Sequence, residues 1–255
     1  MYWSWLRIAG ATAGLSGVVA GYVVNVDRAT RQGQDLGLVL ANYFSLFTIV
    51  STILTAVALT VAASWSMHHP GSSREPFRIA LALALVTAPV LLLGVVFNVL
   101  LRGAPAGAAL SDSPGIALMD AYATEMLHVV LPLYLVIDLA FATRRRALPW
   151  WTLAVFVVYP LIWVFYTMVR GALTPDPSGA TPWWYPYPFL DPHGAGGWPS
   201  AFAYIAVMLV GFVAIGAMII AVGRFRARRA VDAIPVVDGQ TVLQGTGADR
   251  GATRR

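Results

Sequence analysis

The sequence contains no cysteine and no lysine. Without cysteine, the chain can form neither disulfides nor thiolate metal sites. Charged residues are also scarce, since they make up 11% of the 255 residues, against 58% for hydrophobic residues. A soluble domain carries about 25% charged residues, so this shortage excludes most soluble globular folds.

Long apolar stretches fill most of the chain. A helix needs about 20 apolar residues to cross the hydrocarbon core of a bilayer, and six stretches qualify: Trp5 to Val24, Val39 to Ser64, Ile79 to Leu101, Ala121 to Ala142, Trp151 to Met168, and Ala201 to Val222. The sequence therefore predicts an all-α integral membrane protein, a bundle of six transmembrane helices over residues 1–230. Pro160 predicts a kink in the fifth helix, and the polar residues 231–255 predict a disordered tail.

The arginines gather at one side of these stretches. The loops after the second and fourth stretches and the segment after the sixth hold Arg74, Arg78, Arg144, Arg145, Arg146, Arg224, Arg226, Arg228 and Arg229. The other three loops hold only Arg28, Arg31, Arg102 and Arg170. The positive-inside rule then predicts a multi-pass cell-membrane protein with both termini in the cytoplasm. Arginines beside apolar segments argue against a nucleic-acid partner, which would need a basic patch.

Hydroxyl side chains recur at helical spacing within the second stretch. Ser45, Thr48, Thr52 and Thr55 are three, four and three residues apart, so they share one helix face. Polar groups inside a bilayer are costly, which makes them candidates for function. Helix packing also explains such a face, because serine and threonine are common where membrane helices touch.

His128 is the only histidine in any predicted span, and Glu125 lies on the same helix face three residues earlier. The second and fourth stretches cross the membrane in the same direction. Thr48 lies six residues after Asn42, and His128 lies seven residues after Ala121. At a rise of about 1.5 Å per residue, both lie roughly 10 Å below the outer surface. We therefore expect the hydroxyl of Thr48 and the imidazole of His128 to meet.

Further polar residues lie toward the same outer side. The last outer loop reads WWYPYPFLD from Trp183 to Asp191, and its prolines and aromatic residues predict a rigid lid at the membrane interface. Asp138 is the exception, because it lies about 15 Å deeper than His128 and is expected to pair with cytoplasmic arginines. The residues expected to support the site or bind substrate are Glu125, Asn98, Tyr166, Arg170, Tyr187 and Asp191.

Four segments resemble the Pr6Pr membrane proteins, which are related to the androgen-induced-protein family of eukaryotes. These segments are Phe44 to Ser51, Leu127 to Pro132 with Asp138 following, Tyr159 to Gly171, and Tyr185 to Asp191. The eukaryotic members are six-span hydrolases that cleave fatty acid esters of hydroxy fatty acids with a threonine and a histidine. By position, the resemblance implies that Thr48 and His128 have these roles here, with a lipid ester as substrate and no cofactor.

The chemistry of such a pair is acyl transfer. A threonine hydroxyl needs a base, which His128 would supply, and Glu125 would fix the tautomer of that histidine. Asn98, Tyr187 or Arg170 would donate hydrogen bonds to the tetrahedral intermediate. Three alternatives stay open. The protein is a non-enzymatic bundle that binds or transports a lipid or solute, a metal enzyme using Glu125, His128, Asp191 and His193, or a structural protein in which Thr48 and His128 join two helices.

Overall fold

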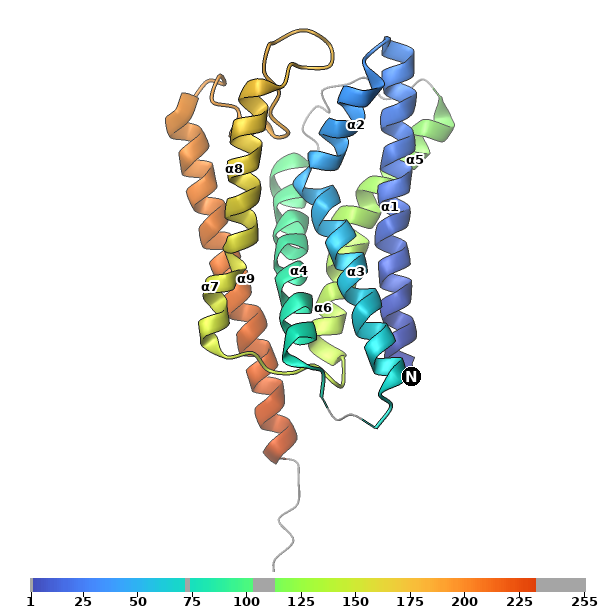
Figure 1. Cartoon of the computed structure of the whole chain (residues 1–255), viewed down its shortest axis with the longest axis vertical. Coiled ribbons are helices and arrows are strands. Elements are labelled where there is room, and N and C mark those ends of the chain that lie inside the picture. Colours follow the sequence, from blue (N-terminus) through green and yellow to red (C-terminus); the bar gives the residue numbers. More distant parts are fainter. Residues whose placement is uncertain (1, 72–73, 103–112, 233–255) are drawn as a thin grey trace, which may run out of the picture.

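The computed structural model describes residues 2–71, 74–102 and 113–232, and their regular structure is entirely helical (Figure 1). Within these residues, six helical segments are long and apolar enough to cross a membrane: Tyr2–Gln32, Phe47–His68, Phe77–Leu100, Pro114–Phe141, Trp150–Leu173 and Gly197–Arg229. The predicted six-helix membrane bundle is therefore confirmed. Residues 233–255, which include most of the predicted tail, lie outside the described residues.

Several spans consist of more than one helical element. The elements are α1 (Tyr2–Gln32), α2 (Leu36–Ser45), α3 (Phe47–His68), α4 (Phe77–Val96), the π-helical turn η1 (Phe97–Leu101), α5 (Pro114–Glu125), the π-helical turn η2 (Met126–Val130), α6 (Leu131–Phe141), η3 (Trp150–Thr152), α7 (Leu153–Phe156), α8 (Val158–Leu173), η4 (Pro188–Leu190) and α9 (Gly197–Asp232). The fourth span thus runs through α5, η2 and α6, and the fifth through η3, α7 and α8.

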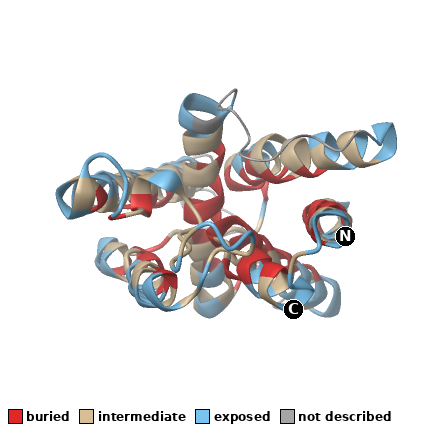
Figure 2. Cartoon of the chain, turned by 90° about the horizontal axis from the view of Figure 1, so that it is seen from above, coloured by how far each residue is buried: buried red, intermediate tan, exposed pale blue. Residues whose placement is uncertain are grey.

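The helices α3 and α4 are the most deeply buried of the six spans, and α9 is the least. Buried residues follow the helix faces that point toward the middle of the bundle (Figure 2). A row of buried glycines lets α1 approach its neighbours closely. For example, a Cβ atom on Gly14 would lie 3.1 Å from Cγ2 of Thr52. Thr52 therefore faces α1, which is a packing role.

The second predicted span is wrong at its outer end, because the chain breaks at Leu46 instead of continuing as one helix. Leu46 has an extended backbone (φ −60°, ψ 134°), and α3 begins at the next residue. The break leaves the carbonyl of Ser45 without a helical partner, and the indole N–H of Trp163 donates to it at 2.9 Å. The hydroxyl of Ser45 donates to the carbonyl of Asn42 at 2.7 Å. The break is thus stabilised by side chains rather than by proline or glycine.

The kink predicted at Pro160 is present as an interruption at Val157, between α7 and α8. Proline has no N–H to donate to the carbonyl four residues earlier, which here belongs to Phe156, and its ring clashes with that carbonyl. The helix resumes with the N–H of Leu161 donating to the carbonyl of Val157 at 3.0 Å.

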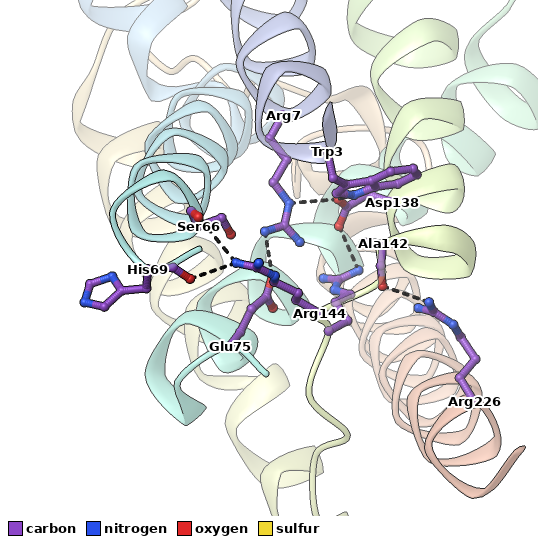
Figure 3. A network of polar contacts seen from close by, with 10 residues as sticks. Trp3, Arg7, Ser66, His69, Glu75, Asp138, Ala142, Arg144 and Arg226 are labelled. Atoms are coloured by element: carbon purple, nitrogen blue, oxygen red, sulfur yellow. Dashed lines mark hydrogen bonds and ion pairs between the residues drawn. The ribbon is translucent and has the colours of Figure 1, made fainter. Parts of the chain in front are cut away.

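A buried charge network joins the helices at one end of the bundle (Figure 3). Asp138 accepts hydrogen bonds from the indole of Trp3 (2.8 Å) and Nε of Arg7 (2.9 Å), and its second oxygen lies 3.3 Å from Nη1 of Arg145. Arg7 also pairs with Glu75. The predicted pairing of Asp138 with arginine is confirmed, while the contribution of Arg7 and Glu75 escaped the sequence analysis.

Two further arginines beside this network donate hydrogen bonds to carbonyls at helix C-termini. Arg144 donates to the carbonyls of Ser66 (3.3 Å) and His69 (3.0 Å) near the end of α3, and Arg226 donates to that of Ala142 (2.8 Å) at the end of α6 (Figure 3). Helix C-termini carry partial negative charge, so guanidinium groups are favoured there. The start of α1 and the end of α9 lie at this same end (Figure 1), which we call the arginine-rich end. The opposite end holds residues 174–196, which we call the lid segment.

Candidate active site

Thr48 and His128 line one cavity of about 80 Å³ inside the bundle. Its walls come from α3, α4, η2, α8, α9 and the lid segment, and most of the lining side chains are aliphatic or aromatic. Among the described residues, no hydrogen bond joins Thr48 directly to His128. Their matched depth predicted that the two side chains would meet. In the structure these two described residues line one largely apolar cavity without a direct hydrogen bond between them.

The break at Leu46 determines the position of Thr48, which lies in the first turn of α3. The first N–H groups of a helix have no partner within the helix, and here the first bond of this kind runs from Val50 to the carbonyl of Leu46. The N–H groups of Phe47 and Thr48 therefore lack an acceptor within the helix, and both residues line the cavity. They also carry the positive end of the helix dipole, which favours negative charge.

Tyr187 of the lid segment lies against this helix start. Its hydroxyl oxygen is 3.4 Å from Oγ1 of Thr48. Burial raises the pKa of Tyr187 above that of a free tyrosine, so the phenol is neutral and can donate a hydrogen bond. The predicted aromatic lid thus reaches into the bundle and contributes Tyr187 directly to the cavity.

The surroundings of His128 determine which ring nitrogen is free. Nδ1 lies 3.0 Å from the carbonyl oxygen of Thr124. A carbonyl only accepts hydrogen bonds, so the neutral ring must carry its proton on Nδ1 and leave the lone pair on Nε2. The ring also stacks on Phe97 at 3.9 Å between centroids. The carbonyl of Thr124 therefore does what the sequence analysis assigned to Glu125.

The backbone at His128 is shaped by three residues around it. Pro132 has no N–H, so the carbonyl of His128 lacks its usual helical partner. Nδ2 of Asn98 supplies one at 3.0 Å. A Cβ atom on Gly94 would lie 3.0 Å from Pro132 and 3.3 Å from that carbonyl, so only glycine lets α4 come this close. Asn98 belongs to η1 and His128 to η2, and π-helical turns are frequent at functional sites.

The remaining predicted residues lie outside the lining of this cavity. Glu125 forms an ion pair with Arg102 at 2.8 Å. Arg170 donates to the side-chain oxygen of Asn42 at 2.7 Å. Tyr166 is exposed, and Asp191 accepts from the backbone N–H of His193 in a turn of the lid segment. Of the predicted supporting residues, the structure therefore brings Tyr187 to Thr48 and Asn98 to the backbone of His128.

The alternative metal set does not assemble. Across residues 2–71, 74–102 and 113–232, no three histidine, aspartate or glutamate side chains cluster as metal ligands would. Glu125 is paired with Arg102, and the ring of His193 stacks on Trp183 at 3.7 Å. Sequence reasoning also missed Trp163, which lines the cavity and caps the carbonyl of Ser45. An indole in an apolar span carries no local signal for that role.

Searches with protein-family models, curated proteins and solved structures find no match to this chain. The chemical capacity of the cavity therefore follows from its own residues. It combines a hydroxyl at a helix start, an imidazole with a free nitrogen and a phenol, all within apolar walls.

Proposed function

We propose that this multi-pass membrane protein is an intramembrane lipid-ester hydrolase, with Thr48 as nucleophile and His128 as base. The observation that carries the proposal is that both residues line one apolar cavity, with Thr48 at the start of a long helix. The same assignment is implied by the resemblance to the Pr6Pr and androgen-induced proteins.

The reaction begins with attack by Thr48 on the ester. Nε2 of His128 takes the hydroxyl proton while Oγ1 bonds to the carbonyl carbon. The resulting oxyanion accepts hydrogen bonds from the N–H groups at the start of α3 and from the phenol of Tyr187. The carbon–oxygen bond to the alcohol then breaks, and the alkoxide takes the proton from His128. An acyl group remains on Thr48.

The second half of the reaction releases the acid. Water attacks the acyl-threonine carbonyl while His128 again accepts a proton. The bond from the carbonyl carbon to Oγ1 breaks, His128 returns the proton to Thr48, and a fatty acid leaves. Every step uses groups of this chain and one water molecule, so no cofactor is needed.

The walls of the cavity support a lipid as substrate. No lining residue carries a fixed charge. Most of the lining side chains are apolar, among them Leu92, Leu93, Phe97, Ile205 and Phe212. Apolar walls of this kind favour an acyl chain, since burying each methylene group contributes about 0.8 kcal/mol. The polar side chains of the lining include those of Thr48, His128 and Tyr187.

We place the arginine-rich end, with both chain termini, in the cytoplasm. Its loops hold Arg74, Arg78 and Arg144 to Arg146, and α9 ends there with four more arginines. The positive-inside rule assigns such loops to the cytoplasmic side. Thr48 then lies on the outer side of α3, because α2 comes down from the lid end to the break and α3 continues from there to the arginine-rich end (Figure 1).

The test is covalent labelling of the purified full-length protein with a lipid-like fluorophosphonate. Wild type should be labelled on the peptide that contains Thr48, and Thr48→Ala and His128→Ala should not be labelled. Thr55→Ala is the matched control, because Thr55 is equally buried in α3 and donates only to the carbonyl of Ser51. It should label like wild type.

Folding of each variant is checked by circular dichroism and thermal unfolding in detergent. Folded wild type that takes up no label, or label that persists in Thr48→Ala, would contradict the hydrolase. Either result would favour the other use of an apolar cavity with a polar end, which is binding or transport of a lipid or solute.

A further inference from the structure

A second, larger cavity of about 840 Å³ lies at the lid end of the bundle, between α1, α2 and the lid segment. We call it the vestibule. Its character is opposite to that of the Thr48 cavity, because many of its lining residues are polar, including Asn25, Arg28, Gln32 and Asn42. Its size is in the range of small-ligand sites, about 300–1,000 Å³.

Asn42 lines the vestibule, and the guanidinium of Arg170 contacts two of its lining residues, Asn42 and Trp184. Asn42 is 4% exposed and accepts from Nη2 of Arg170 at 2.7 Å through Oδ1. Within the part of the chain that the structure describes, the Nδ2 atom of Asn42 and the Nη1 atom of Arg170 are buried and have no hydrogen-bond partner. A buried donor left unpaired is unfavourable by about 1–3 kcal/mol. Such groups in a native protein usually indicate a bound ligand, ion or water.

The charge beside this part of the vestibule is not neutralised by the protein. Within the described residues, no carboxylate lies within ion-pair distance of Arg170 or of Arg28, and Arg28 lines the vestibule. Asp176 is the one acidic lining residue, and its Oδ1 is occupied by the backbone N–H and hydroxyl of Ser178. The guanidinium of Arg170 is held over the ring of Trp184 at 5.5 Å, which fixes its position. The free donors therefore favour an anion.

The vestibule adjoins the Thr48 cavity through two short segments. Leu46 lines the vestibule, while Phe47 and Thr48 line the inner cavity. Likewise Pro186 lines the vestibule, and the next residue, Tyr187, lines the inner cavity. The two cavities are therefore separated by no more than the short segments 46–48 and 186–187.

We propose that the vestibule, through Asn42 and the adjoining Arg170, is an oxyanion-binding site for the phosphate or carboxylate headgroup of an amphiphile whose chain extends toward the Thr48 cavity. Guanidinium and amide donors suit the oxygens of both headgroups. The binding site stands by itself. It rests on the proposed hydrolase only for the further step that the bound amphiphile is the substrate.

The experiment measures binding to full-length Thr48→Ala protein, so that no probe is turned over. The probes are dodecyl phosphate, dodecanoate and dodecanol, which share one chain, together with inorganic phosphate. Binding is followed by calorimetry in an uncharged maltoside detergent. Dodecyl phosphate, dodecanoate or both should bind at least about tenfold more tightly than dodecanol, because hydrogen bonds to charged groups are worth about that much. The tighter of the two identifies the headgroup.

Two variants test the residues, each made together with Thr48→Ala. Arg170→Gln should weaken binding of the anionic amphiphile by about tenfold or more and leave dodecanol unchanged. Arg31→Gln is the matched control, because Arg31 lies at the same end of the bundle but pairs with Asp27 outside the vestibule. Asn42→Asp keeps the side-chain shape and places a negative charge beside Arg170. It should abolish the preference for anions even if Arg170→Gln does not fold.

Three results would overturn the proposal. They are equal affinity for dodecanol and both anionic probes, anion binding that is unaffected in folded Arg170→Gln or Asn42→Asp, and inorganic phosphate that binds as tightly as dodecyl phosphate. The outcome is separable from that of the hydrolase. Arg170-dependent binding without labelling of Thr48 would contradict only the proposed hydrolase activity. Labelling of Thr48 without a preference for anions would contradict only the proposed anion site in the vestibule.

Discussion

Nδ2 of Asn98 lies 3.0 Å from the carbonyl oxygen of His128 and also 2.7 Å from the carbonyl of Gly94, four residues earlier in its own span. One amide group therefore satisfies a carbonyl that Pro132 leaves free and joins the third span to the fourth beside the candidate base. The position of His128 depends on this contact as much as on its own helix.

Asn98→Ala should destabilise the protein by about 1–3 kcal/mol, because the carbonyl of His128 loses its partner in an apolar setting. It should also slow fluorophosphonate labelling of Thr48. Thermal unfolding in detergent measures the first effect. Asn25→Ala is the matched control, since Asn25 donates only to Gly21 in its own helix. Equal stability of the two variants would contradict this role for Asn98.

Gly94→Ala should separate α4 from the fourth span. The added methyl group would lie 3.0 Å from Cγ of Pro132, which cannot move without its ring and helix. Overpacking of this kind destabilises by about 1–3 kcal/mol. Gly115→Ala, where the new methyl group meets none of the described residues within 4 Å, should leave the melting temperature at or slightly above the wild-type value, since alanine favours the helix more than glycine does. A melting temperature for Gly94→Ala at the wild-type value would show that α4 can shift freely.

Tyr187→Phe should reduce the labelling rate of Thr48 by roughly 10²-fold, the usual effect of removing one oxyanion donor. The ring should stay in place, since it stacks on Phe189 at 5.3 Å. Tyr185→Phe removes a hydroxyl two residues away that has no hydrogen-bond partner, and it should label at the wild-type rate. If Tyr187→Phe labels faster than wild type, the phenol blocks the helix start instead of assisting there.

Asp138→Asn should destabilise the bundle by about 3–5 kcal/mol, because it leaves buried Arg7 and Arg145 without their shared carboxylate. The exposed pair of Asp27 and Arg31 provides the comparison, and Asp27→Asn should change stability by no more than about 0.5 kcal/mol. Unfolding of both variants in one detergent measures the contrast. Similar small changes would mean that the network near Asp138 is solvated.

Hydrophobic length alone predicted the six spans, because the bilayer requires long apolar helices whatever their packing. Depth along each helix predicted the pairing of Asp138 with arginine, and it predicted that Thr48 would meet His128, whereas the structure shows only that these two residues line one cavity. The break at Leu46 did not follow, because its sequence contains neither proline nor glycine. Trp163, more than 100 positions away, satisfies the carbonyl that the break frees. Tertiary contacts of this kind override local helical propensity.

The contacts of the charged residues were likewise only partly predictable from the sequence. Glu125 was expected to orient His128, since the two share a helix face. In the structure Glu125 forms an ion pair with Arg102. The position of Arg102 in a predicted loop did not indicate that its side chain would contact the fourth span. Arg7 was missed because a single arginine near a helix end normally extends to the interface. Its burial depends on Glu75 and Asp138 from two other parts of the chain.

The contact of Arg7 with Asp138 also has a consequence for biosynthesis. Their positions differ by 131 residues, so at about 5–20 residues per second the first helix waits on the order of ten seconds for this partner. Meanwhile the guanidinium of Arg7 stays at the water interface, where a long side chain avoids the unfavourable bilayer interior. The buried network of Arg7, Glu75 and Asp138 can therefore be completed only after the fourth span has been synthesised.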